Sequence, residues 1–176
     1  MKRYVLVGIA VLAAACGSSS PSSPSGQPNT VVFTAALSAA NETPAPITDD
    51  EKDGKGNATM TFHLTRDGSG TITAATVDFV YSLSGFPAGT QIILTHIHVG
   101  GPGIGGGVKI GAPLSPASPI TLADGTATNI TFANISGWTD GVPLVQQIID
   151  NPNGYYFNVH SVKHGGGVVR GQLVRQ

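Results

Sequence analysis

The stretch NATMTFHLTRDGSGTITAATVDFVYSL, residues 57–83, predicts a β-hairpin and with it the fold class. Met60, Phe62 and Leu64 alternate with polar residues, and a period of two places the apolar side chains on one face of a strand. A second run rich in β-branched residues follows, and residues 67–70 between the runs are turn formers. We therefore expect two antiparallel strands with one face packed on a core and the other in water.

Short apolar runs separated by Gly, Pro, Asp or Asn continue from residue 31 to the end of the chain, which is typical of strands and turns. The predicted strands are residues 31–39, 57–65, 72–83, 91–99, 108–111, 126–135, 155–162 and 168–174. Residues 143–150 instead carry apolar side chains at helical spacing, so they predict a short helix that begins at Pro143. The expected fold is all-β, an antiparallel β-sandwich or barrel of about eight strands with one short helix.

Length and composition limit the classes of protein that the chain can belong to. Its 176 residues leave room for one domain once a targeting segment is removed. Only 11% of residues are charged, while 24 Gly and 12 Pro favour an extracellular type of β domain. The net charge of −1, with no basic cluster beyond Lys2 and Arg3, argues against nucleic-acid binding. A single Cys excludes an intramolecular disulfide and a Cys-based zinc site.

Residues 1–16, MKRYVLVGIAVLAAAC, have the pattern of a secretory signal peptide. Two basic residues precede an apolar segment that is shorter than the roughly 20 residues of a membrane-spanning helix. Small residues then lead directly to Cys16, an arrangement that resembles a bacterial lipoprotein signal, in which the Cys is lipidated and begins the mature chain. The alternative is an ordinary signal peptide with a buried thiol.

Residues 17–30 form a Ser, Pro and Gly tract, which predicts a disordered tether between the membrane and a domain at residues 31–176. The expected location is the bacterial cell envelope, with the domain lipid-anchored and extracytoplasmic. Residue 17 is Gly rather than the Asp of an inner-membrane retention signal. That favours the outer membrane where the organism has one.

Three histidines on predicted strands are the candidate metal ligands. His96 and His98 are two residues apart, so their rings leave the strand on the same face. His160 shares a face of a later strand with Asn158, and the three rings meet if the two strands are neighbours. Three neutral imidazoles with an open fourth position would suit zinc or copper. Alternatively, the rings hydrogen-bond to backbone carbonyls and to Asn158 or Ser161, because no acidic residue lies nearby to orient them.

Three other features are interpreted as structural. The charged run at residues 49–53 lacks the alternating ligands of a calcium loop and is expected to be a solvated loop. Residues 100–107 are rich in Gly but precede no helix with a Lys and Ser or Thr, so we expect a flexible loop and not a phosphate site. His63 and His164 are expected to face solvent.

Four motifs resemble the CHRD domain, the repeat first recognised in chordin and also found singly in bacterial secreted proteins and lipoproteins. They are residues 36–44 (ALSAANETP), 95–100 (THIHVG), 157–161 (FNVHS) and 169–173 (VRGQL). The resemblance covers residues 31–175. It implies a β-sandwich-like extracytoplasmic domain whose biochemical role is largely undefined. The sandwich or barrel expected from the strand pattern is immunoglobulin-like or superoxide-dismutase-like.

The expected function is a non-enzymatic binding or structural module of the cell envelope, with an unknown protein or small molecule at the cell surface as its ligand. In this interpretation Arg170 is a buried cation paired with a carboxylate such as Glu42. The alternative is a zinc- or copper-binding protein that uses His96, His98 and His160.

Enzymatic roles are less well supported by the sequence. The strand with His-x-His is similar to copper/zinc superoxide dismutase, but those enzymes have more metal ligands and a disulfide that this chain, with one Cys, cannot form. A polysaccharide-cleaving enzyme would need paired carboxylates, and the acidic residues here fall mostly in loops.

Overall fold

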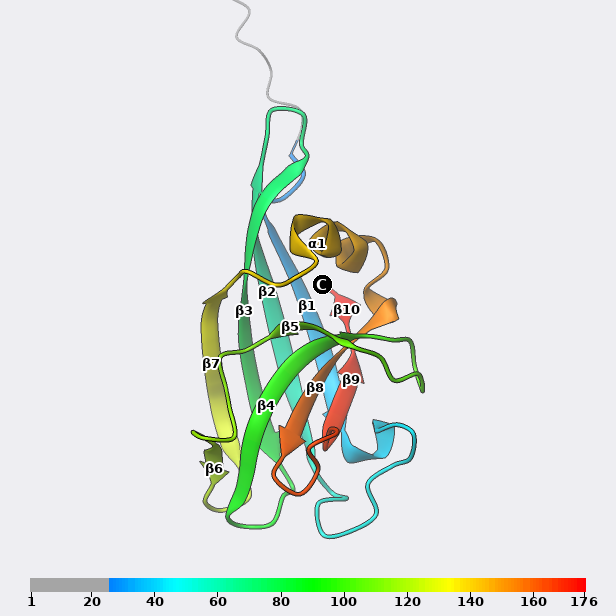
Figure 1. The fold of residues 1–176 in the computed structure, drawn as a ribbon, viewed down its shortest axis with the longest axis vertical. Helices are drawn as coiled ribbons and strands as arrows, with labels where there is room; N and C mark the ends of the chain where they lie inside the picture. The colour runs from blue at the N-terminus through cyan, green and yellow to red at the C-terminus, as the bar shows by residue number, and fades with distance from the viewer. Residues whose placement is uncertain (1–25) are drawn as a thin grey trace, which may run out of the picture.

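The computed structural model describes residues 26–176, which form one ten-stranded antiparallel sheet and one α-helix (Figure 1). The sheet curls into a nearly closed barrel, so the all-β prediction with one short helix is confirmed. The predicted signal segment at residues 1–16, with Cys16, and most of the predicted tether lie outside the described residues.

The strands are β1 (Thr30–Ser38), β2 (Lys55–Arg66), β3 (Ile72–Ser84), β4 (Thr90–Val99), β5 (Val108–Gly111), β6 (Ile120–Leu122), β7 (Ala127–Ile135), β8 (Tyr155–Ser161), β9 (Val169–Gln172) and β10 (Val174–Arg175). Three of them, β6, β9 and β10, depart from the expected pattern. β6 was not predicted, because three residues are too few to show a period. The single strand predicted at residues 168–174 is two short strands separated by Leu173, which instead donates a backbone hydrogen bond to Tyr155.

The order of strands in the sheet differs from their order in the chain. It runs β5-β4-β8-β9-β1-β2-β3-β7, with β10 paired to β1 and β6 paired to β4. The quoted hairpin is β2 and β3, which pair over their whole length. In contrast, β8 inserts between β4 and β9. This crossing brings the residues near 96, 158 and 170 side by side.

Aromatic side chains fill the inside of the barrel. Phe33 and Phe62 meet edge to face at 5.7 Å, and Phe79 and Phe157 do so at 5.1 Å. All four are fully buried. The alternation that predicted these strands therefore marks the side chains of the core.

Helix α1 (Gly141–Asp150) lies at one end of the barrel (Figure 1). It begins two residues earlier than predicted, with Pro143 in its first turn, where a missing N–H costs nothing. Leu144, Val145 and Ile148 are its buried residues, and they follow the helical spacing seen in the sequence. No helix in residues 26–176 has the length and apolarity needed to cross a membrane.

Strand β8 differs from the others because all seven of its residues are buried. Its inward side chains, such as Phe157 and Val159, belong to the apolar core. Its outward side chains, Tyr156, Asn158 and His160, are polar and are nevertheless 2–4% exposed. Loops must therefore cover the outer face of the sheet at this point, and this covered polar layer contains the candidate site.

Candidate functional site

Three histidine side chains meet in the polar layer on the outer face of β4 and β8. The antiparallel register places His96 opposite Asn158 and Leu94 opposite His160. The ring centroids are 4.9 Å apart for His96 and His160, 5.4 Å for His96 and His98, and 5.7 Å for His98 and His160. One ring nitrogen from each residue lies within 4.8 Å of the other two, close enough for all three to hold one metal ion.

Backbone carbonyls from two loops fix the protons of two of these rings. Nδ1 of His98 lies 2.9 Å from the carbonyl oxygen of Gly106, and Nδ1 of His160 lies 3.0 Å from that of Gly165. Because a carbonyl oxygen only accepts hydrogen bonds, both Nδ1 atoms carry the proton and both Nε2 atoms present a lone pair. Nε2 of His160 accepts from Nδ1 of His96 at 3.1 Å, whereas Nε2 of His98 is buried without a partner.

Burial favours the neutral form of all three imidazoles. Together with the neighbouring His160 and His98, burial lowers the pKa of His96 to about 4, and burial is the largest cause. Burial also lowers the pKa of His98 and of His160, against the opposing hydrogen bonds to the Gly106 and Gly165 carbonyls. A neutral imidazole is the form that binds metals, so the cluster is in its ligating form near neutral pH.

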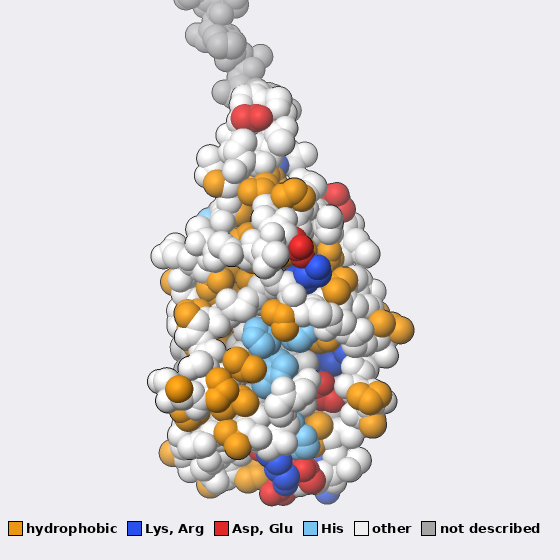
Figure 2. Space-filling view, viewed as in Figure 1, with side chains coloured by type: hydrophobic (Ala, Val, Ile, Leu, Met, Phe, Trp, Pro, Cys, Tyr) orange, Lys and Arg blue, Asp and Glu red, His pale blue; other side chains and the backbone are white. Residues whose placement is uncertain are grey.

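The cluster reaches the surface on one side. Figure 2 shows histidine side chains together near the middle of one face, with apolar side chains beside them. His96 is the partly exposed member of the three, whereas His98 and His160 are buried. Val99, Ile104 and Val108, at or near the glycine-rich loop, are exposed apolar residues. A ligand or partner therefore has access from the His96 side.

A buried arginine lies next to the cluster. The Arg170 side chain is 1% exposed, and its Cζ lies 3.5 Å from the centroid of the Tyr156 ring. The Tyr156 ring stacks in turn on the His98 ring, 5.0 Å away and tilted by 11°. A guanidinium over an aromatic face is an attractive contact. The Tyr156 ring therefore links the arginine to the histidine cluster.

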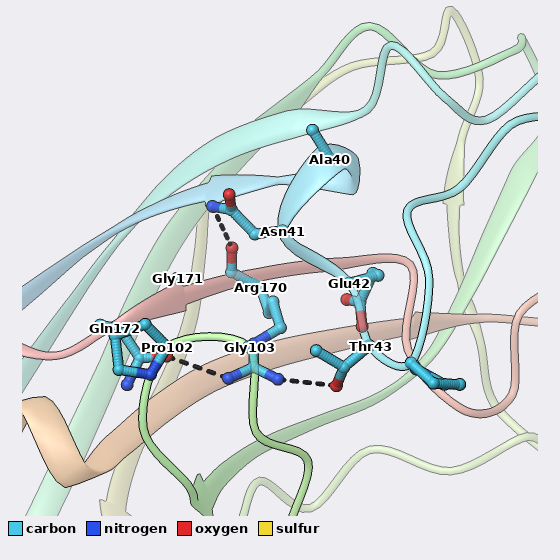
Figure 3. Close-up of a pocket in the computed structure, with 10 residues that line it drawn as sticks. Ala40, Asn41, Glu42, Thr43, Pro102, Gly103, Arg170, Gly171 and Gln172 are labelled. Atoms are coloured by element: carbon cyan, nitrogen blue, oxygen red, sulfur yellow. Dashed lines mark hydrogen bonds between the residues drawn. The ribbon is translucent and has the colours of Figure 1, made fainter.

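Neutral oxygen atoms accept the hydrogen bonds of the Arg170 guanidinium (Figure 3). Nη1 donates to Thr43 Oγ1 at 2.9 Å, and Nη2 donates to Gln172 Oε1 at 3.0 Å. Carbonyls of Ile104 and Gly101 in the glycine-rich loop accept further bonds at 3.2–3.3 Å. The sequence led us to expect an ion pair with a carboxylate, but the guanidinium is held by a loop and two neutral side chains.

Glu42, the carboxylate expected to pair with Arg170, also lies in this polar layer. It is 6% exposed, and its Oε1 atom has no hydrogen-bond partner. Burial raises its pKa to about 7, and the charge of Arg170, the backbone N–H of Thr43 and the Asn158 side chain each lower it partly. The carboxyl group therefore stands between its neutral and charged forms at neutral pH.

A surface pocket of about 420 Å³ opens beside Arg170. Three segments line it, with Figure 3 showing their side chains: the turn after β1, the glycine-rich loop and strand β9. The lining residues are Ala40, Asn41, Glu42, Thr43, Pro44, Pro102, Gly103, Arg170, Gly171 and Gln172. The pocket thus has hydrogen-bonding groups on several sides, as small-ligand sites have.

The loop at residues 49–53 is less solvated than its sequence predicted. Glu51 is 4% exposed, and its Oε2 accepts a 2.6 Å hydrogen bond from Ser161 Oγ at the end of β8. His164, expected to face solvent, is half-buried and hydrogen-bonds to Asp49 at 3.0 Å. His63 lies on the surface and contacts Asp78 at 2.9 Å.

Some members of the polar layer could not be identified from the sequence. The carbonyls of Gly106 and Gly165 are placed by contacts between distant segments, and no local pattern marks them. In contrast, simple alternation along residues 155–161 does predict that Tyr156 shares one face of the strand with Asn158 and His160.

The family model of the CHRD domain matches residues 33–173 of the chain. That range contains every residue of the histidine cluster and of the pocket. No curated protein and no solved structure matches the chain.

Proposed function

The chain belongs to the CHRD domain family, and on this premise we propose that it is a non-enzymatic binding or structural module of the bacterial cell envelope. In this proposal lipid on Cys16 holds the chain to the membrane, and residues 17–30 connect the lipid to the barrel. The ligand is a protein or a small molecule at the cell surface. The observation that carries the binding role is the pocket beside Arg170, which lies within the family match.

The construction of the pocket supports binding rather than catalysis of a reaction. Both terminal nitrogens of Arg170 donate to Thr43, Gln172 or loop carbonyls, so the side chain holds the walls of the pocket in place. Asn41 adds a further bond by donating to the Arg170 carbonyl at 3.2 Å. A preformed concave surface of this kind loses little conformational entropy when a ligand binds.

A variant that narrows the pocket tests whether the pocket binds a partner. Ala40 is exposed and lines the pocket, so Ala40→Trp adds an indole at its rim. We expect this variant to lose the cross-links to surface proteins that the wild-type chain forms on intact cells, as read by mass spectrometry. Ala123→Trp is the matched control, because Ala123 is exposed in the turn after β6 and does not line the pocket. If both variants keep the wild-type cross-links, the pocket is not where a protein partner binds.

The anchor is tested by Cys16→Ser. We expect the wild-type chain to incorporate labelled fatty acid and to be found in the membrane fraction, because a lipidated Cys supplies the apolar attachment. The variant is expected to lose the label and to leave the membrane fraction. A wild-type chain that carries no label would remove the anchor from the proposal.

A second candidate function is a zinc- or copper-binding protein that uses His96, His98 and His160. The observation that favours it is the buried Nε2 of His98, which has no partner. An unpaired buried polar atom is destabilising, and a metal ion would satisfy it. The metal titration described below tests this candidate.

A further inference from the structure

The metal-binding candidate leaves open how the rings would be held in the orientation that a metal needs. Ligating histidines usually donate their second ring N–H to a carboxylate, a carbonyl or water, which fixes the tautomer and the ring plane. Among residues 26–176, no carboxylate accepts the Nδ1–H of His98 or His160, because these two rings donate to the carbonyls of Gly106 and Gly165. Both carbonyls belong to glycine-rich segments.

The carbonyl of Gly106 reaches His98 because the glycine-rich loop runs very close to the end of β4. A Cβ atom on Gly106 would lie 1.9 Å from the carbonyl oxygen of Val99, so only glycine fits there. The backbone N–H of Gly106 also donates a hydrogen bond to the Tyr156 hydroxyl, with 3.2 Å between nitrogen and oxygen. In contrast, a Cβ on the neighbouring Gly107 would meet no atom within 4 Å.

The hydrogen bond between His96 and His160 indicates which atoms would bind the ion. Nδ1 of His160 is protonated by its bond to Gly165, so its Nε2 must be the acceptor and Nδ1 of His96 the donor. An ion between the rings would replace that one proton. The proton would move to Nε2 of His96, on the partly exposed ring, so the ring stays neutral.

We propose that the two glycine-rich loops orient this cluster for a zinc or copper ion, through the carbonyl oxygens of Gly106 and Gly165. His98 and His160 then ligate through Nε2, and His96 through Nδ1. This inference rests on the second candidate function. It assigns to the glycine-rich loop at residues 100–107 a positioning role in a metal site.

The test titrates the full chain, purified in mild detergent without a polyhistidine tag, with zinc sulfate or with copper against a chromophoric chelator. Gly106→Ala is expected to weaken binding by about 10–100-fold, the usual effect of losing the group that orients a ligand. Gly107→Ala, the matched control, is expected to bind as the wild type does. The titrations with the two metals show which ion the site prefers.

The readout specific to positioning is the tautomer of each ring, seen in long-range ¹H–¹⁵N spectra of the histidines. The metal-free wild type is expected to show His98 and His160 protonated at Nδ1, and Gly106→Ala to show a mixture at His98. A His98 ring protonated at Nε2 in the wild type would overturn the inference, even if Gly106→Ala does not fold. Equal metal affinity of the two glycine variants would overturn it as well.

Failure of the second candidate function gives a different result. In that case the wild type binds neither metal, or His160→Gln binds as tightly as the wild type does. The tautomer spectra are then unchanged by added metal. Both the metal site and its orientation by the loop are supported if the wild type and Gly107→Ala bind the metal tightly and Gly106→Ala binds it weakly.

Discussion

Arg170→Met is expected to lower the free energy of unfolding by about 3–5 kcal/mol, a large share of the stability of a small domain. The guanidinium is 1% exposed and donates to oxygens of Thr43, Gln172 and the glycine-rich loop. Methionine would fill much of the volume but would remove the donor of these hydrogen bonds to half-buried acceptors, and each hydrogen bond to a charged group contributes about 1.5–3 kcal/mol. Urea unfolding at fixed pH measures the change.

Lys109→Met is the matched control for this variant. Lys109 forms a 2.6 Å ion pair with Asp140 at the surface, and exposed pairs contribute up to about 1 kcal/mol. The control should therefore unfold near the wild-type urea midpoint. Similar stability for both variants would mean that Arg170 contributes no more than a surface cation does.

Glu42→Gln is expected to make the protein more stable than the wild type at pH 8 and equally stable near pH 4. Burial raises the pKa of Glu42 from 4.5 to about 7, so the folded state holds a proton that the unfolded state releases. The unfolded chain therefore binds fewer protons between these two values, and wild-type stability falls as the pH rises from about 4.5 to about 7. The pKa shift corresponds to a loss of about 3 kcal/mol in the free energy of unfolding of the wild type. The Gln side chain of the variant is always neutral, so the variant does not lose this stability.

Unfolding curves of both proteins from pH 4 to pH 8 test this prediction. The buried histidines have lowered pKa values, so they add a stability change of opposite sign at acid pH. Both proteins contain them, and the difference between the two curves isolates Glu42. A difference that does not vary with pH would refute the raised pKa. Because Arg170 lowers the pKa of Glu42, the Arg170→Met background should move the transition to higher pH.

Local patterns predicted the parts of this fold that depend on neighbours in the sequence. The period of two identified seven strands at nearly their observed bounds and placed His96 and His98 on one face, because side-chain direction is set by the strand itself. The convergence with His160 additionally requires β8 to pair with β4. The sequence predicts only that the three rings meet if these two strands are neighbours. The structure shows that they are neighbours.

The same patterns failed where burial comes from distant segments. The charged loop at residues 49–53 appeared solvated, yet Glu51 is buried against Ser161, which lies 110 residues later in the chain. The glycine-rich loop appeared flexible, yet its carbonyls bind Arg170 and His98. Glycine composition shows that a backbone can approach closely, but it does not show which side chain it approaches.

The sheet order also has a consequence for how the barrel forms. Strand β1, the first described strand, pairs with β9 and β10, the last two strands of the chain, and Ser38 is aligned with Arg170. Contacts between such distant residues form slowly, because a long loop must close before they are gained. Until the last residues are available, β1 keeps an unpaired edge that can bind other strands. A chain truncated before β9 would therefore be prone to aggregate, because pairing of β9 and β10 with β1 is the step that covers this edge.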